Sequence, residues 1–251
     1  MNAALKSLVW LAAIVAASAI AFMLGGYATD VYRKMLIWVA LALSYNFLFG
    51  ISGQVAFSQL VTVVINEGGD LTGGTGGIAS YRLPDLFGIH IRGPYYTILL
   101  VLMVAFTLWV LKKLDASAFG RACRAVRDNA TAAAAMGVDV RRTKVIAFTL
   151  TSTLAGLAGI SYAYIDNVIN PPVFGLENAF LLLFMIIVGG QGRMAGAIVG
   201  AVLLYLAPFV LEPIVGHGFM VVFGLLVVLA ILFQPAGLVG LFARWPARRT
   251  A

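Results

Sequence analysis

The chain has 251 residues, of which 62% are hydrophobic and only 11% are charged, and its mean hydropathy is +0.99. Soluble proteins carry roughly 25% charged residues, so this composition excludes a soluble globular domain. The formal net charge of +7 comes from basic residues at the ends of apolar runs. No basic face interleaved with aromatic side chains is present, so we do not expect nucleic acid to be a partner.

Seven apolar segments predict an all-α, polytopic transmembrane helical bundle that forms a single domain over residues 1–251. A spanning helix needs about 20 apolar residues, and several segments lie at the short end of the usual range. The first segment lacks a clear cleavage site and is predicted to span the membrane rather than to be a signal peptide. The segments are 7–26, 35–51, 95–111, 145–165, 174–189, 195–211 and 219–235.

A polar island at 112–144 separates the third and fourth segments. It holds eight Lys and Arg residues against three Asp residues, which predicts a cytoplasmic loop because basic residues in short loops stay in the cytoplasm. If all seven segments cross the membrane and this loop is cytoplasmic, the N-terminus lies outside and the C-terminus lies inside. Arg33 and Lys34 then fall inside, and the count is fourteen basic residues inside against three outside.

The weakest segment is 174–189, whose apolar core is short. If it were re-entrant, the basic tail 243–249 would lie outside, so we predict a true crossing that is broken or tilted. The external region 52–94 is expected to be shortened and largely non-helical, because glycine is dense between residues 68 and 77. It contains no G-x-x-x-x-G-K-[ST] motif, which argues against a nucleotide site.

Within the island, the sequence predicts a short helix over residues 130–136. Asp128 or Asn129 can cap its N-terminus, and Gly137 suits the position just after its C-terminus. About two turns of helix barely hold together in water, so the helix is expected either to dock onto a partner or to remain part of a solvated connector.

The chain lacks the residue patterns of an enzyme or of an ion-coupled transporter. The predicted spans hold almost no ionisable residues, and Asp166, Glu177 and Glu212 all fall near predicted ends. His90 and His217 are isolated in external loops, and Cys123 is the single cysteine. We therefore expect no catalytic residues, no metal site and no cofactor, and any transport must draw its energy from another subunit.

Small residues recur inside the segments and allow helices to approach closely. Gly196 and Gly200 form a G-x-x-x-G pair, and Gly156 and Gly159 lie in the fourth segment. Ordinary helix packing is the expected role for most of them.

Five motifs in order resemble one family. They are GISGQVAFSQ, LTGGTGGI, the stretch from SAFGRACRAVRDNATAAAAMGVDV to TLAGLAGISYA, LLLFMIIVGGQGRMAGAIVGAVLL and ILFQPAGLVGL. Together they resemble the LivM-like branch of the permease subunits of ATP-binding-cassette (ABC) importers for branched-chain amino acids and urea.

The resemblance implies a multi-pass protein of the bacterial inner membrane, embedded in lipid, that moves a small solute and is not itself an enzyme. Its partners would be a second permease subunit, two cytoplasmic ABC ATPases that hydrolyse ATP, and a periplasmic solute-binding protein. The helix at 130–137 would be the coupling helix, which sits in a groove of the ATPase and transmits its closure to the spans 95–111 and 145–165.

The resemblance also assigns residues. Those expected to couple to the ATPase are Gly120, Arg121, Arg124, Asn129, Ala133, Ala134, Met136 and Gly137. Those expected along the substrate path are Gln54, Ser58, Gly189, Gly190 and Gly192.

The chain departs from the family upstream of the Thr-Gly-Gly stretch. The family has two further membrane helices there, whereas only Leu60–Glu67 separates the two motifs here, which indicates an internal deletion. Three alternatives therefore remain: a permease for urea or a short amide, a shortened scaffold that assembles without transporting, and a channel that works without an ATPase.

Overall fold

The computed structural model describes residues 3–48, 78–79, 85–86, 89–90, 94–166, 168–169, 175–216, 224–225 and 237–240. The helices are α1 (Ala3–Met23), α2 (Gly26–Leu48), α4 (Pro94–Ala116), α5 (Ala118–Asp128), α6 (Ala130–Ala135), α7 (Val140–Asp166), α8 (Leu176–Gly189) and α9 (Met194–Val215). Two short antiparallel ladders accompany them: β1 (Ile78–Ala79) pairs with β4 (Val168–Ile169), and β2 (Asp85–Leu86) pairs with β3 (Ile89–His90).

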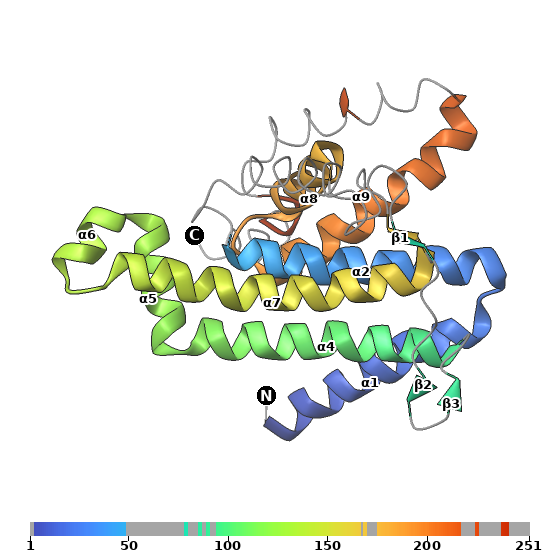
Figure 1. Cartoon of the computed structure of the whole chain (residues 1–251), viewed down its shortest axis with the longest axis horizontal. Coiled ribbons are helices and arrows are strands. Elements are labelled where there is room, and N and C mark those ends of the chain that lie inside the picture. The colour runs from blue at the N-terminus through green and yellow to red at the C-terminus, as the bar shows by residue number, and fades with distance from the viewer. Residues whose placement is uncertain are drawn as a thin grey trace, which may run out of the picture.

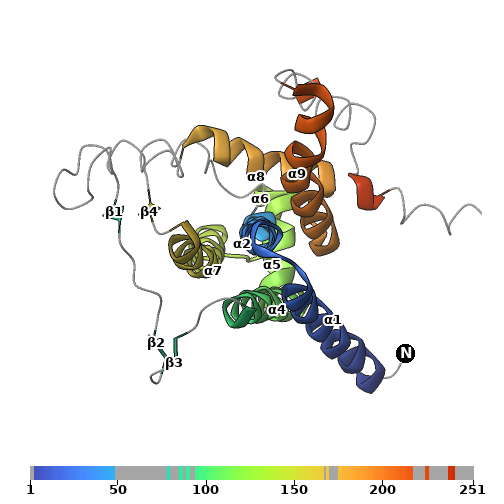
Figure 2. The same cartoon turned by 90° about the vertical axis from the view of Figure 1, so that its right-hand side faces the viewer.

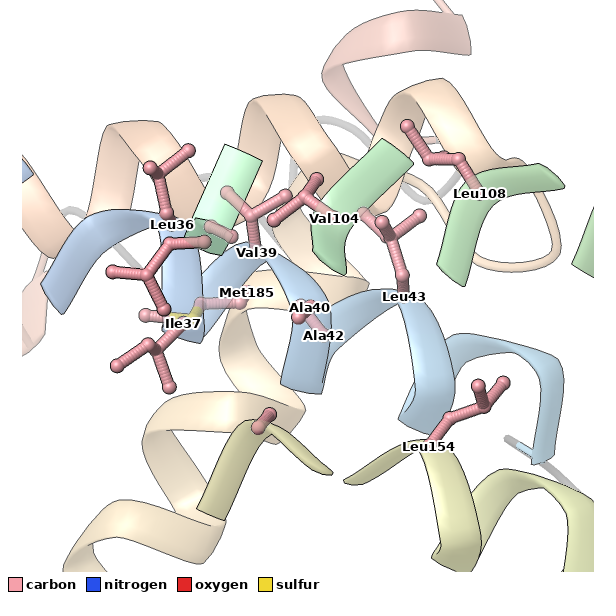
Figure 3. Packing of buried hydrophobic residues seen from close by; sticks show 14 of the residues in the cluster. Leu36, Ile37, Val39, Ala40, Ala42, Leu43, Val104, Leu108, Leu154 and Met185 are labelled. Atoms are coloured by element: carbon pink, nitrogen blue, oxygen red, sulfur yellow. The ribbon is translucent and has the colours of Figure 1, made fainter. Parts of the chain in front are cut away.

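The bundle is built around α2. Seen end-on, α2 lies between α4, α7, α8 and α9, and it contacts all four (Figure 2). Its Ile37, Ala40 and Ala42 are fully buried, and they meet buried side chains of the other helices such as Leu154 and Met185 (Figure 3). Because lipid is as apolar as these side chains, close packing rather than exclusion of water holds such a core together.

Among the described residues, three helices are long and apolar enough to cross a membrane. They are Pro94–Ala116, Val140–Asp166 and Met194–Pro213, and they coincide with three of the predicted segments. Trp10–Ile20 and Glu177–Gly189 are shorter apolar helices. The last predicted segment, 219–235, lies almost wholly outside the described residues.

The directions of the helices are given relative to the two ends of the bundle. The island end carries α5 and α6, and the outer end carries the start of α4 and the end of α7 (Figure 1). The predicted direction of the first two helices is wrong relative to these ends. Lys34 of α2 pairs with Asp166 at the end of α7, and the Arg33 Nε donates to Thr97 Oγ1 at the start of α4, at 2.9 Å. Arg33 and Lys34 therefore lie at the outer end, opposite the island.

The first helix is reversed as well. Lys112, at the island end of α4, lies over the ring of Trp10, so α1 runs from the island end outward and α2 returns. The charge count missed this because Arg33 and Lys34 are ion-paired with Asp30 and Asp166 and do not act as free topological signals. The eight basic residues of the island dominate the count of inside charges whichever way α1 and α2 run.

The close packing of the α8–α9 hairpin accounts for the spacing of the small residues in this part of the chain. A Cβ built on Gly200 would lie 1.8 Å from the Met185 carbonyl oxygen, and one on Gly189 would lie 1.9 Å from that of Gly196. The close approach expected for Gly196 and Gly200 is thus present. A Cβ on Gly156 or Gly159 of α7 would meet nothing within 4 Å, so the described residues show no close helix contact at these two glycines.

The axis of α8 is steeply inclined to those of α2, α4 and α7, which Figure 2 shows end-on while α8 is seen lengthwise. The predicted membrane crossing of the segment 174–189 stays a prediction. After α9, the short stretch Gly237–Gly240 returns to the island end, where a Cβ on Gly237 would lie 2.1 Å from the Gly190 Cα.

Candidate functional site

The candidate site is the cap that α5 and α6 form over the island end. Helix α5 begins at Ser117, whose Oγ accepts a hydrogen bond from the Gly120 backbone N–H at 3.2 Å. A Cβ on Gly120 would lie 2.3 Å from the Leu114 carbonyl oxygen, so only glycine lets α5 turn back this tightly under α4. Gly120, Cys123 and Val126 form the buried face of α5, and its arginines occupy the other faces.

Helix α6 confirms the short helix predicted in the island, with caps at both ends. The Asn129 side chain accepts from the Ala132 N–H at 3.0 Å, so Asn129 rather than Asp128 is the N-cap. Gly137 has φ +83°, as expected after the C-terminus. The Val138 N–H donates to the Ala133 carbonyl and the Gly137 N–H donates to the Ala134 carbonyl, each at 3.0 Å, which is a Schellman motif.

The two faces of α6 differ. Ala133 is 4% exposed and packs inward, whereas Met136 is 84% exposed and Ala134 faces solvent. Ala133 packs α6 against its own chain, and the exposed residues are Thr131, Ala132, Ala134, Ala135 and Met136. The expected coupling of Ala133 and Ala134 to the ATPase stays a prediction.

A short link joins α6 directly to the long helix α7. Only residues 136–139 lie between the two helices, and the Asp139 carboxylate accepts from the Arg142 N–H at 2.9 Å. An acceptor in this position satisfies a free N–H of the first turn, and its negative charge suits the helix N-terminus. The N-cap residue Asp139 and this short link thus fix α6 to the start of the 27-residue helix α7.

Beneath α5 lies a pocket of about 270 Å³ that gathers residues from four parts of the chain. It brings together two groups that the sequence kept apart, because the coupling residues Gly120 and Arg124 and the path residue Gly192 all line it. Leu43, Asn46, Phe47, Leu111, Asp115, Cys123, Arg127, Arg193 and Met194 complete the lining.

Three arginines and one aspartate make this pocket positive. The Arg124 guanidinium pairs with Asp115 across the α4–α5 turn. The Arg127 guanidinium lies so close to Gly192 that a Cβ there would be 2.7 Å from its Nη1. Burial raises the pKa of the Cys123 thiol, which stays neutral at physiological pH.

The α8–α9 turn is tied to α2 at the rim of the pocket. The Gly192 N–H donates to Asn46 Oδ1 at 3.0 Å, and Asn46 is 6% exposed. This contact fixes the turn beneath α5 and explains why glycine, with φ +74°, occupies the position.

The substrate-path prediction is only partly tested by the described residues. Gln54 and Ser58 lie outside them. Gly189 and Gly190 are buried at the α8–α9 contact, and their place on the substrate path stays a prediction. Arg121 is exposed on α5, away from the pocket lining.

A second, smaller pocket of about 90 Å³ lies between α2, α7 and α8. Four hydroxyl groups line it, from Ser44, Tyr45, Thr151 and Ser152. The Ser44 and Thr151 hydroxyls donate to carbonyls of their own helices, at 2.9 and 2.8 Å, so each hydroxyl oxygen retains its capacity to accept a hydrogen bond.

Sequence reasoning missed Asn46, Arg127, Arg193 and the four hydroxyl residues. Each pocket is lined by at least three separate segments of the chain, so no local spacing marks the whole group. In the described part of the chain, no cluster of three His, Cys, Asp or Glu side chains is placed to hold a metal ion.

Comparison with known proteins finds a matching family and several relatives of the chain. The model of the family "Branched-chain amino acid transport system / permease component" matches residues 3–233. The high-affinity branched-chain amino acid transport system permease protein LivM of Escherichia coli K12 is 26% identical over 208 residues, covering 73% of this chain and 49% of the relative. A probable LivM of Methanocaldococcus jannaschii is 25% identical over 200 residues, covering 74% and 58%.

A third relative has a different cargo in its name. The autoinducer 2 import system permease protein LsrC of E. coli O9:H4 is 37% identical over 123 residues, covering 47% of this chain and 34% of the relative. No solved structure matches the chain. The chain spans about half the length of the LivM relatives of E. coli and Salmonella typhimurium. With a family model matched over nearly its whole length and three apolar helices of spanning length in its described part, the chain belongs to the permease components of ABC-type branched-chain amino acid transport systems.

Proposed function

We propose that the chain is the membrane-spanning subunit of an ATP-driven importer of branched-chain amino acids in the bacterial inner membrane. It pairs with a second permease subunit, two cytoplasmic ATPases bind its island end, and a periplasmic protein delivers the solute. The family match and the names of the LivM relatives support the cargo. ATP hydrolysis belongs to the partner subunits.

The exposed cap of α6 is the observation that carries this proposal. A helix of six residues gains little from its own hydrogen bonds, yet here it is capped at both ends and held by Ala133. It projects beyond α5 at the tip of the island end (Figure 1). Its outer surface consists of small side chains and one large flexible one, Met136, which suits insertion into a groove of another protein.

The coupling residues act in two ways under this proposal. Ala134 and Met136 contact the ATPase. Three other residues position α6. Gly120 permits the α4–α5 turn, Ala133 packs inward, and Gly137 adopts the left-handed backbone conformation. Arg121 and Arg124 supply positive charge beside this surface, and Asn129 holds the first turn.

We infer that the solute passes the hydroxyl-lined pocket between α2, α7 and α8. Its neutral acceptors suit the ammonium group of an amino acid, and Leu41 and Leu182 in its wall suit an aliphatic side chain. Gln54 and Ser58 remain predicted path residues upstream of it.

The test is co-purification of the full chain and its partner permease with the candidate ATPases. The decisive variant is Ala134→Trp, which adds bulk to the outer face of α6. The matched control is Ala195→Trp, an exposed alanine in the first turn of α9. We expect the first variant to lose the ATPase and the second to keep it. Ala133→Trp and Gly137→Trp are unsuitable, since one residue is buried and the other has φ +83°.

Two results would overturn the proposal. If wild type binds no ATPase in the presence of its partner permease, α6 is not a coupling helix. If the complex forms but proteoliposomes show no ATP-dependent leucine uptake, the chain is a scaffold, as its shortened external region would allow. Uptake of urea or of autoinducer 2 in place of leucine would reassign the cargo.

A further inference from the structure

A groove between α1 and α4 combines an apolar wall with two lysine side chains. It encloses about 330 Å³ and is lined chiefly by Trp10 and Ile14 of α1 and by Trp109, Lys112 and Lys113 of α4. Its lining contains no acidic residue. The groove takes no part in the α6 cap or in the hydroxyl-lined pocket.

The two lysines are held in place by the two tryptophans. The Lys112 Nζ lies 3.6 Å from the centroid of the Trp10 ring, and the Lys113 Nζ lies 4.2 Å from that of Trp109. A cation over an aromatic face is attracted to it while its other N–H donors stay available. Both lysines are exposed.

The groove lies where a phospholipid would meet it. Helix α1 packs at the edge of the bundle, mainly against α4, so the groove is at the periphery and not in the core (Figure 2). Lys112 and Lys113 are in the last turns of the spanning helix Pro94–Ala116, at the island end. Tryptophan and lysine at this depth mark the boundary between acyl chains and headgroups.

We propose that this groove binds one anionic phospholipid of the cytoplasmic leaflet. Its phosphate lies between the Lys112 and Lys113 ammonium groups, and one acyl chain runs along Ile14 and the two indole rings. Charge complementarity selects the anionic headgroup, because two lysines and no acidic residue line the groove. The apolar wall selects a lipid over a free phosphate ion, which would gain nothing from it.

Bromine-labelled lipids test the proposal directly, since bromine quenches nearby tryptophan fluorescence. The full chain is reconstituted in bilayers that contain brominated phosphatidylglycerol or, at the same mole fraction, brominated phosphatidylcholine. We expect stronger quenching by phosphatidylglycerol. The double variant Lys112→Gln/Lys113→Gln should lower the relative affinity for phosphatidylglycerol roughly tenfold or more. Lys112→Arg/Lys113→Arg should retain it.

Two controls locate the effect. Arg141→Gln/Arg142→Gln removes the same charge from exposed residues at the start of α7 and should keep the preference. Trp10→Phe/Trp109→Phe should abolish the extra quenching, because two of the four tryptophans of the chain line the groove.

Several outcomes would overturn the proposal. Equal quenching by the two lipids would remove the selectivity. Equal loss in the α7 control would show a general surface field instead of a site. Displacement of the lipid by inorganic phosphate would show an anion site without an acyl chain. Protection of both indoles by self-association, seen in analytical ultracentrifugation, would assign the groove to a second copy.

Discussion

Lys34 and Asp166 form an ion pair that joins α2 to the last turn of α7 at the outer end of the bundle. Their side chains are 32% and 25% exposed, and the Lys34 Nζ also lies 6.0 Å from the centroid of the Tyr162 ring. A carboxylate at a helix C-terminus faces the negative end of the helix dipole, so Asp166 depends on Lys34 for its stability.

Removing the lysine should therefore cost more than removing the carboxylate. Lys34→Met leaves Asp166 unpaired beside the helix carbonyls and should lower the unfolding free energy by about 1–3 kcal/mol, between the values for exposed and buried pairs. Asp166→Asn should cost less. Thermal unfolding in detergent measures both.

The double variant Lys34→Met/Asp166→Asn completes the cycle. It should recover part of the loss, since no buried charge is left without a partner. Additive losses in the double variant would show that the two residues act independently, against the pairing seen here.

The α8–α9 contact predicts opposite effects of one substitution at two glycines. Gly200→Ala places a Cβ 1.8 Å from a backbone carbonyl oxygen and should destabilise the bundle by about 1–3 kcal/mol. Gly156→Ala meets nothing within 4 Å and should be neutral or stabilising by up to about 1 kcal/mol, because alanine favours the helix. Similar melting temperatures for the two variants would contradict the packing.

The hydrogen bond from Gly192 to Asn46 predicts a local loss. Asn46→Ala removes a buried acceptor of the exposed Gly192 N–H, which water can then reach, and should cost about 0.5–1.5 kcal/mol. Asn46→Asp retains an acceptor oxygen, and its charge faces Arg127 and Arg193 across the pocket, so it should cost less. If the aspartate variant were the weaker of the two, another interaction would be holding the turn.

Cys123 reports on whether α5 stays seated. The thiol is 5% exposed, and burial raises its pKa, so N-ethylmaleimide should react with it far more slowly than with an exposed cysteine. The matched control is Cys123→Ala/Ala134→Cys, which moves the thiol to the outer face of α6. Both rates should rise with pH as thiolate forms, and the control should lead throughout.

The same pair of variants probes docking. Addition of the ATPase should protect a cysteine at position 134 and leave the rate at Cys123 unchanged. Rapid modification of Cys123 in the isolated chain would mean that α5 separates from α4 and α7.

Local sequence signals predicted helix α6 and its two ends well. Asn129 and Gly137 carry the two ends of α6 in their own chemistry, so the helix was found to within one residue. Which face it buries could not be predicted, because a run of four alanines has no amphipathic pattern.

The other sequence signals could not show which residues pair across helices in the folded chain. Arg33 and Lys34 resemble the cytoplasmic flank of a span until Asp30 and Asp166 are seen beside them. Gly189 and Gly190 were predicted as path residues without any sign of their packing, yet Gly189 lies against α9 and Gly190 against Gly237. The pockets are made by residues from separate helices, and spacing along the chain carries no record of them.

Helix α7 runs unbroken for 27 residues, about 40 Å at 1.5 Å per residue, from the α6 junction to Asp166. It has no proline and no described kink along this length, so it can act as a stiff lever across the bundle. A displacement of α6 at one face of the membrane would then appear at the opposite face as a pull on the Lys34–Asp166 pair. The chain thus carries a single mechanical element that reaches from the proposed ATPase contact to the outer end, and breaking its far attachment should loosen the response to ATP without touching the surface that ATPases bind.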